Sequence, residues 1–333
     1  LQAALSMASV GADGNTRDEI NRAIGLDGFT TEDVCSFYET LVPALLKVDR
    51  TVDIAIANSV WAKPEAKMKD GYAKMLQESF SASVHELGKN SQADINKWVN
   101  KATKGMIKDM DADLDNAMMV LLNALYFKGI WSDVFEKKQN RQETFTNYDG
   151  QSKTIDFMFK DEKMGYYYGE VASAVNLPYG NGAYRMTIVI PTDEKSSIDD
   201  VLGMLDNEVW AEISNPSSKG TVYLHLPKFE CEFSIGLKPV MQTLGISEAF
   251  EDYAQFPYMA ENPLKINDIA QKAKIKVDEQ GTEAAAVTQI IMGVTSAGPD
   301  HDAFVFKVNT PFFYTISEVS TGTILFAGVQ KWM

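Results

Sequence analysis

The chain has 333 residues, of which 45% are hydrophobic and 23% are charged. These proportions are those of ordinary folded proteins, so they exclude a disordered chain, a collagen and a disulfide-stapled miniprotein. The chain has 31 lysines and arginines against 46 aspartates and glutamates, which gives a net charge of −15. Because such a surface repels phosphate backbones and anionic lipids, the composition argues against a nucleic-acid-binding protein.

The sequence contains neither a disulfide framework nor a stretch that is apolar for the length of a membrane-spanning helix. Cys35 and Cys231 can form one bridge at most, and their apolar neighbours favour buried free thiols. The segment Leu1–Met7 has the pattern of the interior of an apolar helix without a cap before it. We therefore expect the natural N-terminus to lie further upstream.

The first third of the chain has helical patterns. Thr16–Glu19 has the sequence of a capping box, and the helix that it would begin ends at Gly25. A second capping box is predicted at Thr30–Asp33 and begins another helix. The predicted apolar face of that helix consists of Val34, Phe37, Leu41 and Leu45. An alternating, β-branched strand is predicted over Thr51–Ala62, and a capped amphipathic helix over Ser91–Lys104.

The rest of the chain alternates strands with short helices. Met118–Lys128 is continuously apolar apart from Asn123, as in a central strand that is buried on both faces. Tight turns are predicted at Asp149-Gly150, Asn181-Gly182 and Thr321-Gly322. The other expected elements are a helix over Ser197–Ile213, a strand over Thr221–Phe233, a short helix over Gly236–Gly245, a strand over Ala273–Glu279 and three or so strands over Ala303–Trp332. Helices followed by interleaved strands, without a linker or a repeat, predict one α+β domain over residues 1–333.

Residues 279–302 do not fit a packed domain, because they join two predicted strands by an unusually long connection. An extended chain would place Thr282, Ala284, Ala286 and Thr288 on one face. This face is small and uncharged, so it could enter between two strands of a sheet without overpacking the core beneath. An alanine-rich helix over Thr282–Ala286 is about equally favoured by propensity.

A resemblance to a known family favours the strand. Val277–Ala286 resembles the hinge of the reactive-centre loop of the serpins, the serine protease inhibitor family. Further segments that resemble serpins follow the same order along the chain: Gly11–Ile20, Asn123–Trp131, His225–Phe229, Leu244–Ile246, Asn309–Phe312 and Phe326–Gly328. The resemblance implies the α+β serpin fold, with a mixed central β-sheet, further sheets, surrounding helices and an exposed reactive-centre loop over residues 279–302. It also implies that the chain begins inside the family's second helix and lacks its N-terminal helix and first strand.

The same resemblance implies a single-use inhibitor and no enzymatic activity. In serpins, a serine protease attacks a bond in the exposed loop and forms an acyl-enzyme. The cut loop then inserts into the central sheet as a new strand and drags the protease with it, so that the distorted active site cannot complete deacylation. The driving force is a metastable native fold whose strain is released on insertion.

The resemblance also assigns roles within the loop. The hinge consists of Gly281, Thr282, Glu283, Ala284, Ala285 and Ala286, with the glycine as the pivot. The family's loop spacing places the reactive bond at Thr295–Ser296, with Val294–Thr295 as the alternative. Small apolar residues near this bond suit an elastase-like or subtilisin-like protease, and the absence of Arg and Lys between Lys276 and Lys307 argues against a trypsin-like target.

Two supporting regions are implied outside the loop. Lys228 and Glu279 match a salt bridge at the place where the loop enters the sheet, and Trp131 matches an aromatic residue packed there. Asn123 matches a polar residue in the region where the central strands part. The histidine that usually partners this asparagine is replaced by Gln271, which can still donate and accept a hydrogen bond.

Other classes of protein have little support in the sequence. Hydrolase, metalloprotease, redox and phosphate-loop motifs are missing, and the three histidines, His85, His225 and His301, have no ligand-spaced neighbours. We therefore expect no cofactor and no metal site. The remaining alternative is a non-inhibitory serpin with a carrier, chaperone or storage role.

The expected partner is the target serine protease. We expect no heparin control, because the net charge is −15 and the segment Asp70–Val84 carries Lys74 as its one cation. We also expect a monomer that acts in the extracellular space or at the cell surface.

Overall fold

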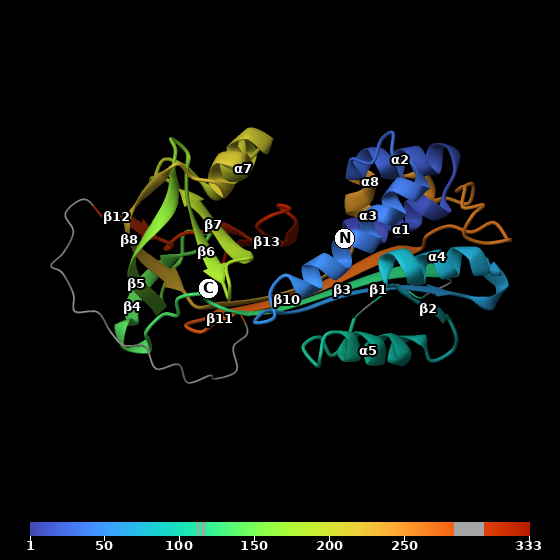
Figure 1. Ribbon diagram of the computed structural model, residues 1–333, viewed down its shortest axis with the longest axis horizontal. Helices are drawn as coiled ribbons and strands as arrows, with labels where there is room; N and C mark the ends of the chain where they lie inside the picture. Colours follow the sequence, from blue (N-terminus) through green and yellow to red (C-terminus); the bar gives the residue numbers. More distant parts are fainter. Residues whose placement is uncertain (111, 113, 115–116, 283–302) are drawn as a thin grey trace. The chain divides into compact units, whose positions relative to one another are not determined.

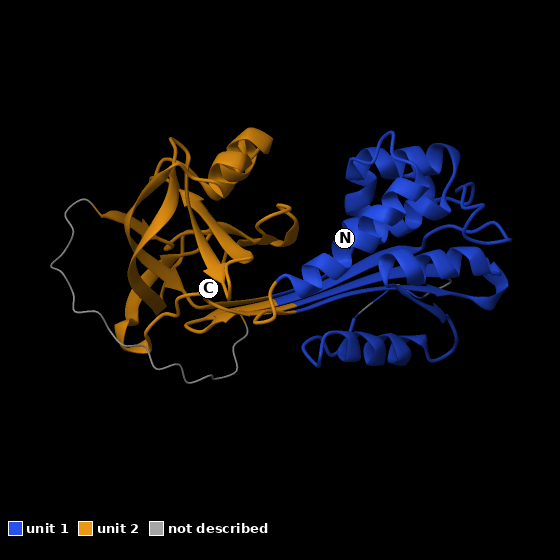
Figure 2. Ribbon diagram, in the orientation of Figure 1, with its two compact units in different colours: residues 1–48, 54–126, 232–274 blue, residues 49–53, 127–231, 275–333 orange. Residues whose placement is uncertain are grey.

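The computed structural model describes residues 1–110, 112, 114, 117–282 and 303–333. They form two compact units, which Figure 2 shows in separate colours. Unit 1 comprises residues 1–48, 54–126 and 232–274, and unit 2 comprises residues 49–53, 127–231 and 275–333. Each unit is thus assembled from segments that are far apart in the sequence. The single domain predicted over residues 1–333 stays a prediction.

One β-sheet has the strand order β2-β1-β3-β11-β10-β9 and is called the central sheet below (Figure 1). Its strands are β1 (Asp53–Ala62), β2 (Ser83–Glu86), β3 (Met119–Ile130), β9 (Phe229–Gly236), β10 (Asp268–Asp278) and β11 (Gly281–Thr282). β3 and β10 contribute residues to both units. β3 is buried along most of its length, which confirms the central strand predicted from its continuous apolar sequence.

The other sheet lies in unit 2 and has the order β12-β8-β5-β6-β7-β13-β14, with β4 paired to β5. Its strands are β4 (Arg141–Thr146), β5 (Ser152–Tyr168), β6 (Ala172–Tyr179), β7 (Tyr184–Pro191), β8 (Ser218–Pro227), β12 (Phe304–Lys307), β13 (Phe312–Glu318) and β14 (Ile324–Gln330). The turns predicted at Asp149-Gly150, Asn181-Gly182 and Thr321-Gly322 connect successive strands of this sheet and are confirmed. The strands after Ala303 are confirmed as well.

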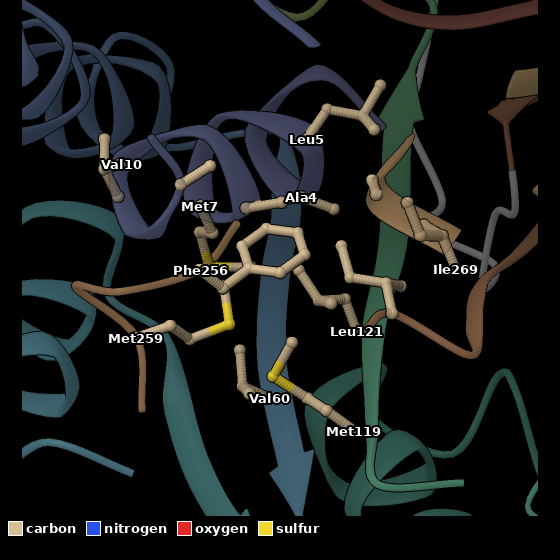
Figure 3. Packing of buried hydrophobic residues seen from close by; sticks show 14 of the residues in the cluster. Ala4, Leu5, Met7, Val10, Val60, Met119, Leu121, Phe256, Met259 and Ile269 are labelled. Atoms are coloured by element: carbon tan, nitrogen blue, oxygen red, sulfur yellow. The ribbon is translucent and has the colours of Figure 1, made fainter. Parts of the chain in front are cut away.

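Helices pack on the strands of unit 1. They are α1 (Gln2–Gly11), α2 (Gly14–Ile24), α3 (Thr31–Lys47), α4 (Asp70–Phe80), α5 (Ser91–Ala102) and α8 (Lys238–Thr243), with 3₁₀ turns at Pro64–Ala66 and Glu248–Phe250. Residues 4–11 of α1 are all buried. Figure 3 shows Ala4 and Met7 of α1 in one apolar cluster with Phe256, Leu121 of β3 and Val60 of β1. Burial of each large apolar side chain contributes about 2 kcal/mol, so packing against the sheet stabilises this helix.

Unit 2 contains two helices where the sequence predicts one. The predicted helix over Ser197–Ile213 is divided into α6 (Ile198–Met204) and α7 (Asn207–Ser214), and a 3₁₀ turn lies at Lys137–Gln139. The carboxylate of Asp206 accepts hydrogen bonds from the backbone N–H groups of Glu208 and Val209, both at 2.9 Å. This side chain caps a new helix, and the prediction of one continuous helix is therefore wrong.

The two predicted capping boxes have different outcomes. Thr30 and Asp33 form the predicted box at the start of α3. At Thr16 the prediction is wrong, because α2 begins at Gly14 and the Thr16 hydroxyl donates to Glu248 at 2.6 Å instead. The hydroxyl that the local sequence predicts to cap the helix instead bonds to a residue that is distant in the sequence.

Some boundaries and faces also differ from the predictions. The predicted strand Thr221–Phe233 is interrupted at Lys228, between β8 and β9, and β10 begins five residues before the predicted Ala273, at Asp268. On α3 the side chain of Phe37 is 53% exposed, while Tyr38 and Val42 are buried in its place.

Cys35 and Cys231 are free thiols as predicted, but each is only half-buried, where the sequence predicted full burial. Among the described helices, none is long and apolar enough to cross a bilayer.

Candidate functional site

The first two residues of the predicted hinge form a strand inside the central sheet. In β11, Gly281 lies opposite Ile130 and Thr282 opposite Gly129 of β3, in antiparallel register. On the other side, the same two residues pair with Asp278 and Val277 of β10. Further along, β3 and β10 pair directly in parallel, over residues 120–125 and 268–273. The sheet is therefore opened at one end by a two-residue strand and closed beyond it (Figure 1).

The rest of the predicted loop lies outside the described residues. This applies to the hinge residues Glu283, Ala284, Ala285 and Ala286 and to the choice between strand and helix after Thr282. It also applies to the reactive bond at Thr295–Ser296 and to the alternative at Val294–Thr295. These assignments stay predictions.

Gly281 occupies a backbone position that a residue with a side chain cannot share. Its φ is +148°, and a Cβ atom added to it would lie 2.0 Å from the carbonyl oxygen of Gly129 and 2.8 Å from the Cα of Ile130. Both obstructing atoms are backbone atoms, which cannot rotate away as a side chain would. The glycine allows the chain to enter the sheet directly beside β3.

Thr282 is fixed by a buried hydroxyl pair. It is 1% exposed, and its hydroxyl hydrogen-bonds with that of Tyr179 at 2.5 Å. The ring of Tyr179 stacks on Trp131 with centroids 4.4 Å apart and an angle of 13° between the planes. Burial raises the pKa of Tyr179 far above its ordinary value, so its hydroxyl stays protonated and can donate. No pattern in the sequence marks Tyr179, because 103 residues separate it from Thr282.

Trp131 contacts the turn between β10 and β11. Its indole N–H donates to the carbonyl oxygen of Asp278 at 3.0 Å, and its backbone N–H donates to that of Gln280 at 2.9 Å. These two bonds hold the turn between β10 and β11 against the end of β3. The turn therefore presents Gly281 to the sheet in a fixed orientation.

Lys228 and Glu279 are brought together in unit 2, 3.4 Å apart. The carboxylate of Glu279 also accepts from the side-chain amide of Asn140 at 2.5 Å, and Lys228 also pairs with Asp156 at 2.8 Å. Burial by itself raises the pKa of Glu279, but hydrogen bonds from the backbone and Asn140, together with the charge of Lys228, outweigh it and lower the pKa overall. The residues that the sequence did not indicate are Asn140 and Asp156, which lie on segments remote from the loop.

Asn123 and Gln271 lie in unit 1, opposite each other in the register of β3 and β10. The side-chain amide of Asn123 donates to Asn58 Oδ1 on β1 at 2.8 Å. The structure thus identifies Asn58 as a partner of Asn123 that the sequence did not indicate. Asn58 and Asn123 are both buried.

The described histidines have protein partners. His85 stacks on Trp61 with centroids 4.1 Å apart, and His225 Nδ1 lies 2.6 Å from Glu143 Oε1. His301 is outside the described residues. Within the described part of the chain, no group of three or more His, Cys, Asp and Glu side chains is arranged to hold a metal ion.

Comparison with known proteins agrees with this geometry. The sequence profile of the serpin family, described as serpin (serine protease inhibitor), matches residues 1–331. Iripin-3 of Ixodes ricinus is 30% identical over 340 residues, which cover 98% of this chain and 86% of that protein. Intracellular coagulation inhibitor 2 of Tachypleus tridentatus is 31% identical over 342 residues, which cover 98% of this chain and 83% of that protein.

A solved structure shows the same fold. The crystal structure of the thermophilic serpin tengpin in the native state superposes with a TM-score of 0.90 at 28% identity, covering 100% of this chain and 86% of that one. The predicted fold class and family resemblance are confirmed. The chain belongs to the serpin family, most of whose members are inhibitors of serine proteases and not enzymes.

Proposed function

We propose that this serpin is a covalent, single-use inhibitor of serine proteases of the elastase or subtilisin type. The observation that carries the proposal is the position of Gly281 and Thr282 between β3 and β10. The chain of the predicted loop already enters the central sheet at the point where a longer inserted strand would begin.

The register of β11 describes the path of that longer strand. If the pairing of Thr282 with Gly129 continued after cleavage, Ile291 would lie opposite Val120, near the start of β3. Nine added residues at about 3.3 Å each would carry a bound protease about 30 Å along the sheet. To form this strand, the direct pairing of β3 with β10 over residues 120–125 and 268–273 must open.

The side chains of the loop fit such an insertion. Thr282 is buried in the sheet, and the positions that follow on the same face are Ala284, Ala286 and Thr288. These residues are small and uncharged, so the new strand adds no buried charge to the core. The residues before the proposed bond, Ile291, Met292 and Val294, support a target with a small apolar specificity pocket.

The direct test mixes the protein with pancreatic elastase and, separately, with subtilisin. The expected products are a complex that survives SDS and a released fragment that begins at Ser296, identified by mass spectrometry. Complete digestion without a complex would contradict the inhibitory function and favour the carrier, chaperone or storage alternative. A fragment that begins at Thr295 would move the bond to Val294–Thr295.

Substitution at Thr282 tests the insertion step. Thr282→Arg is expected to convert the inhibitor to a substrate, because burying a charge in β11, from which the inserted strand would continue, costs several kcal/mol. Thr282→Ser keeps the hydroxyl and the small volume, and it should still form the complex. Both are measured as moles of inhibitor consumed per mole of protease, and equal values for Thr282→Arg and the parent would contradict the role of the hinge.

We also propose that the protein acts outside the cell or at its surface, where secreted proteases are encountered. Fractionation of the producing cells with an antibody to the protein tests this location. Recovery in the cytosolic fraction alone would contradict it.

A further inference from the structure

A pocket of about 770 Å³ lies in unit 2, beside the strand that follows the loop. Three segments form its walls: residues 146–148 after β4, residues 190–198 between β7 and α6, and the chain from β12 to Pro311. We call it the β12 pocket. None of the residues assigned to loop insertion lines it.

β12 presents an exposed apolar side chain to this pocket. Val305 and Lys307 line the β12 pocket, while Phe306, between them in the sequence, is buried in the opposite face. Val305 is 58% exposed, although β12 is the edge strand of its sheet. An exposed apolar residue on an edge strand marks a surface that is suited to contact with another protein.

The charges in the β12 pocket are unbalanced in favour of negative charge. The ammonium of Lys307 is neutralised by Glu143 Oε2 at 2.6 Å. Asp193 and Glu194 are exposed and line the pocket, and the Asp193 carboxylate is oriented by the backbone N–H of Lys195 at 2.8 Å. The side chain of Lys195 does not line the pocket. A partner that complements this surface would present a basic side chain next to an apolar one.

The position of the β12 pocket in the chain indicates which partner supplies that side chain. Val305 is nine residues after Ser296 of the proposed reactive bond, so the chain between these two residues can span about 30 Å at most. A protease of about 220 residues has a radius of gyration of about 17 Å, so an enzyme docked on the loop can cover this distance with its own surface. The net charge of −15 also attracts a basic enzyme, as the negative charge of the pocket does.

We propose that the β12 pocket is a docking site for the target protease outside the cleaved loop, and that it receives a basic side chain from the rim of that enzyme. This proposal rests on the inhibitory function proposed above. It assigns Glu194 to charge recognition and Val305 to the apolar contact. Both act on the encounter with the protease, before the bond is cut, so they change the association rate and leave loop insertion unchanged.

The test measures the second-order rate constant of complex formation with neutrophil elastase, a basic protease, at low and high salt. Glu194→Lys is expected to lower the rate about tenfold at low salt and to weaken its salt dependence, and Glu194→Gln should have a smaller effect in the same direction. Val305→Thr keeps the β-branched shape but adds a hydroxyl, and it should lower the rate about threefold at both salt concentrations. The number of inhibitor molecules consumed per protease should not change in any of these variants.

Matched controls separate the pocket from general effects. Glu208→Gln removes an exposed carboxylate from α7, and Val319→Thr changes a valine that is 40% exposed after β13. Both controls lie outside the β12 pocket and should react as the parent does. If the parent forms the complex but the Glu194 and Val305 variants match their controls, the docking site is overturned and the inhibitory function stands. If the parent forms no complex at all, the inhibitory function itself fails, and the docking site fails with it.

A second copy of the chain is the competing occupant. Sedimentation velocity of the parent and of Val305→Thr at several concentrations tests it. A single monomeric species for both proteins is expected. A dimer that Val305→Thr dissociates would make the pocket an interface between copies and would overturn its assignment to the protease.

Discussion

At the scale of single residues, the turn from β10 into β11 depends on a few residues that other amino acids cannot replace. Gly281 lies against the backbone of β3, and Glu279 is 5% exposed with its charge held by Lys228 and Asn140. The first is a steric requirement, and the second is an electrostatic one. They can therefore be tested independently.

Gly281→Ala is expected to lower the free energy of unfolding by about 2 kcal/mol or to expel β11 from the sheet, because its Cβ would overlap the Gly129 carbonyl. Urea denaturation measures the first outcome, and limited proteolysis next to Thr282 measures the second. Gly182→Ala is the control, since Gly182 also has a positive φ, of +88°, but has open space around the added Cβ. A loss no larger than that of the control would show that the close approach to β3 is unimportant.

Glu279 should make the loop entrance sensitive to acid. Its pKa lies below the ordinary value of 4.5, so its contribution to stability is present above that pH and is lost as the pH falls through the folded-state pKa. We therefore expect Glu279→Gln to destabilise the protein by about 1 kcal/mol at pH 7 and by less at pH 3.5. Urea midpoints at both pH values measure this difference. The control is Glu136→Gln, which affects an exposed pair with Lys138 that also lowers the pKa of its carboxyl. Because solvent screens this pair, the variant should show a smaller pH-dependent difference, and an equal pH dependence in the two variants would contradict the role of Glu279.

At the scale of elements, short strands lie on both sides of residues 283–302 in the sequence. β11 has two residues and β12 has four, and each depends on side-chain contacts in addition to its backbone pairing. β12 pairs in parallel with β8, and Lys307 connects it to Glu143 of β4, which in turn contacts His225 of β8. The Glu143 side chain is 11% exposed, so its charge is poorly hydrated and needs these partners.

Lys307→Met is expected to loosen β12. It removes a charge partner from Glu143 while keeping the length of the side chain, so the edge strand should open more often. Hydrogen exchange of the amides of residues 305–307 should become about tenfold faster. Lys163→Met, on the exposed side of β5, is the control and should leave this exchange unchanged. Unchanged exchange in Lys307→Met would show that backbone pairing with β8 alone holds β12.

At the scale of the whole molecule, the function proposed here requires a native state that is not the most stable arrangement of the chain. β3 and β10 pair directly over only part of their length, and β11 separates them at one end. Insertion of a full strand between them adds hydrogen bonds on both sides and buries a face of small residues. A gain in stability on cleavage, which the proposed function requires, would therefore be a property of the whole sheet.

Cleavage of the loop should raise the melting temperature by more than about 10 °C, because several kcal/mol of new pairing and burial are added to a domain of this size. Circular dichroism of the parent before and after digestion with elastase measures the shift. The cleaved form of Thr282→Arg, in which insertion is opposed, is the control and should gain much less. Equal melting temperatures of the cut and uncut parent would contradict insertion.

Elements with strong local patterns are predictable from this sequence. The apolar run of β3, the Asp-Gly and Asn-Gly turns of the second sheet and the capping box of Thr30 all depend on neighbours in the chain, and the structure confirms them. The errors occur where a distant group competes with a local one. Thr16 bonds to Glu248, and Asp206 caps α7 and divides a helix that periodicity joins.

The sequence by itself determined the family, the order of the elements and the pairing of Lys228 with Glu279, because motifs in collinear order carry this information. Only the tertiary structure showed that Gly281 and Thr282 already lie between β3 and β10, and that Tyr179, Asn140 and Asp156 complete the entrance of the loop. It alone revealed the β12 pocket. The physical reason is that these contacts join residues up to 153 positions apart, as Thr282 and Gly129 are, and no local propensity or spacing encodes which distant side chains a sheet brings together.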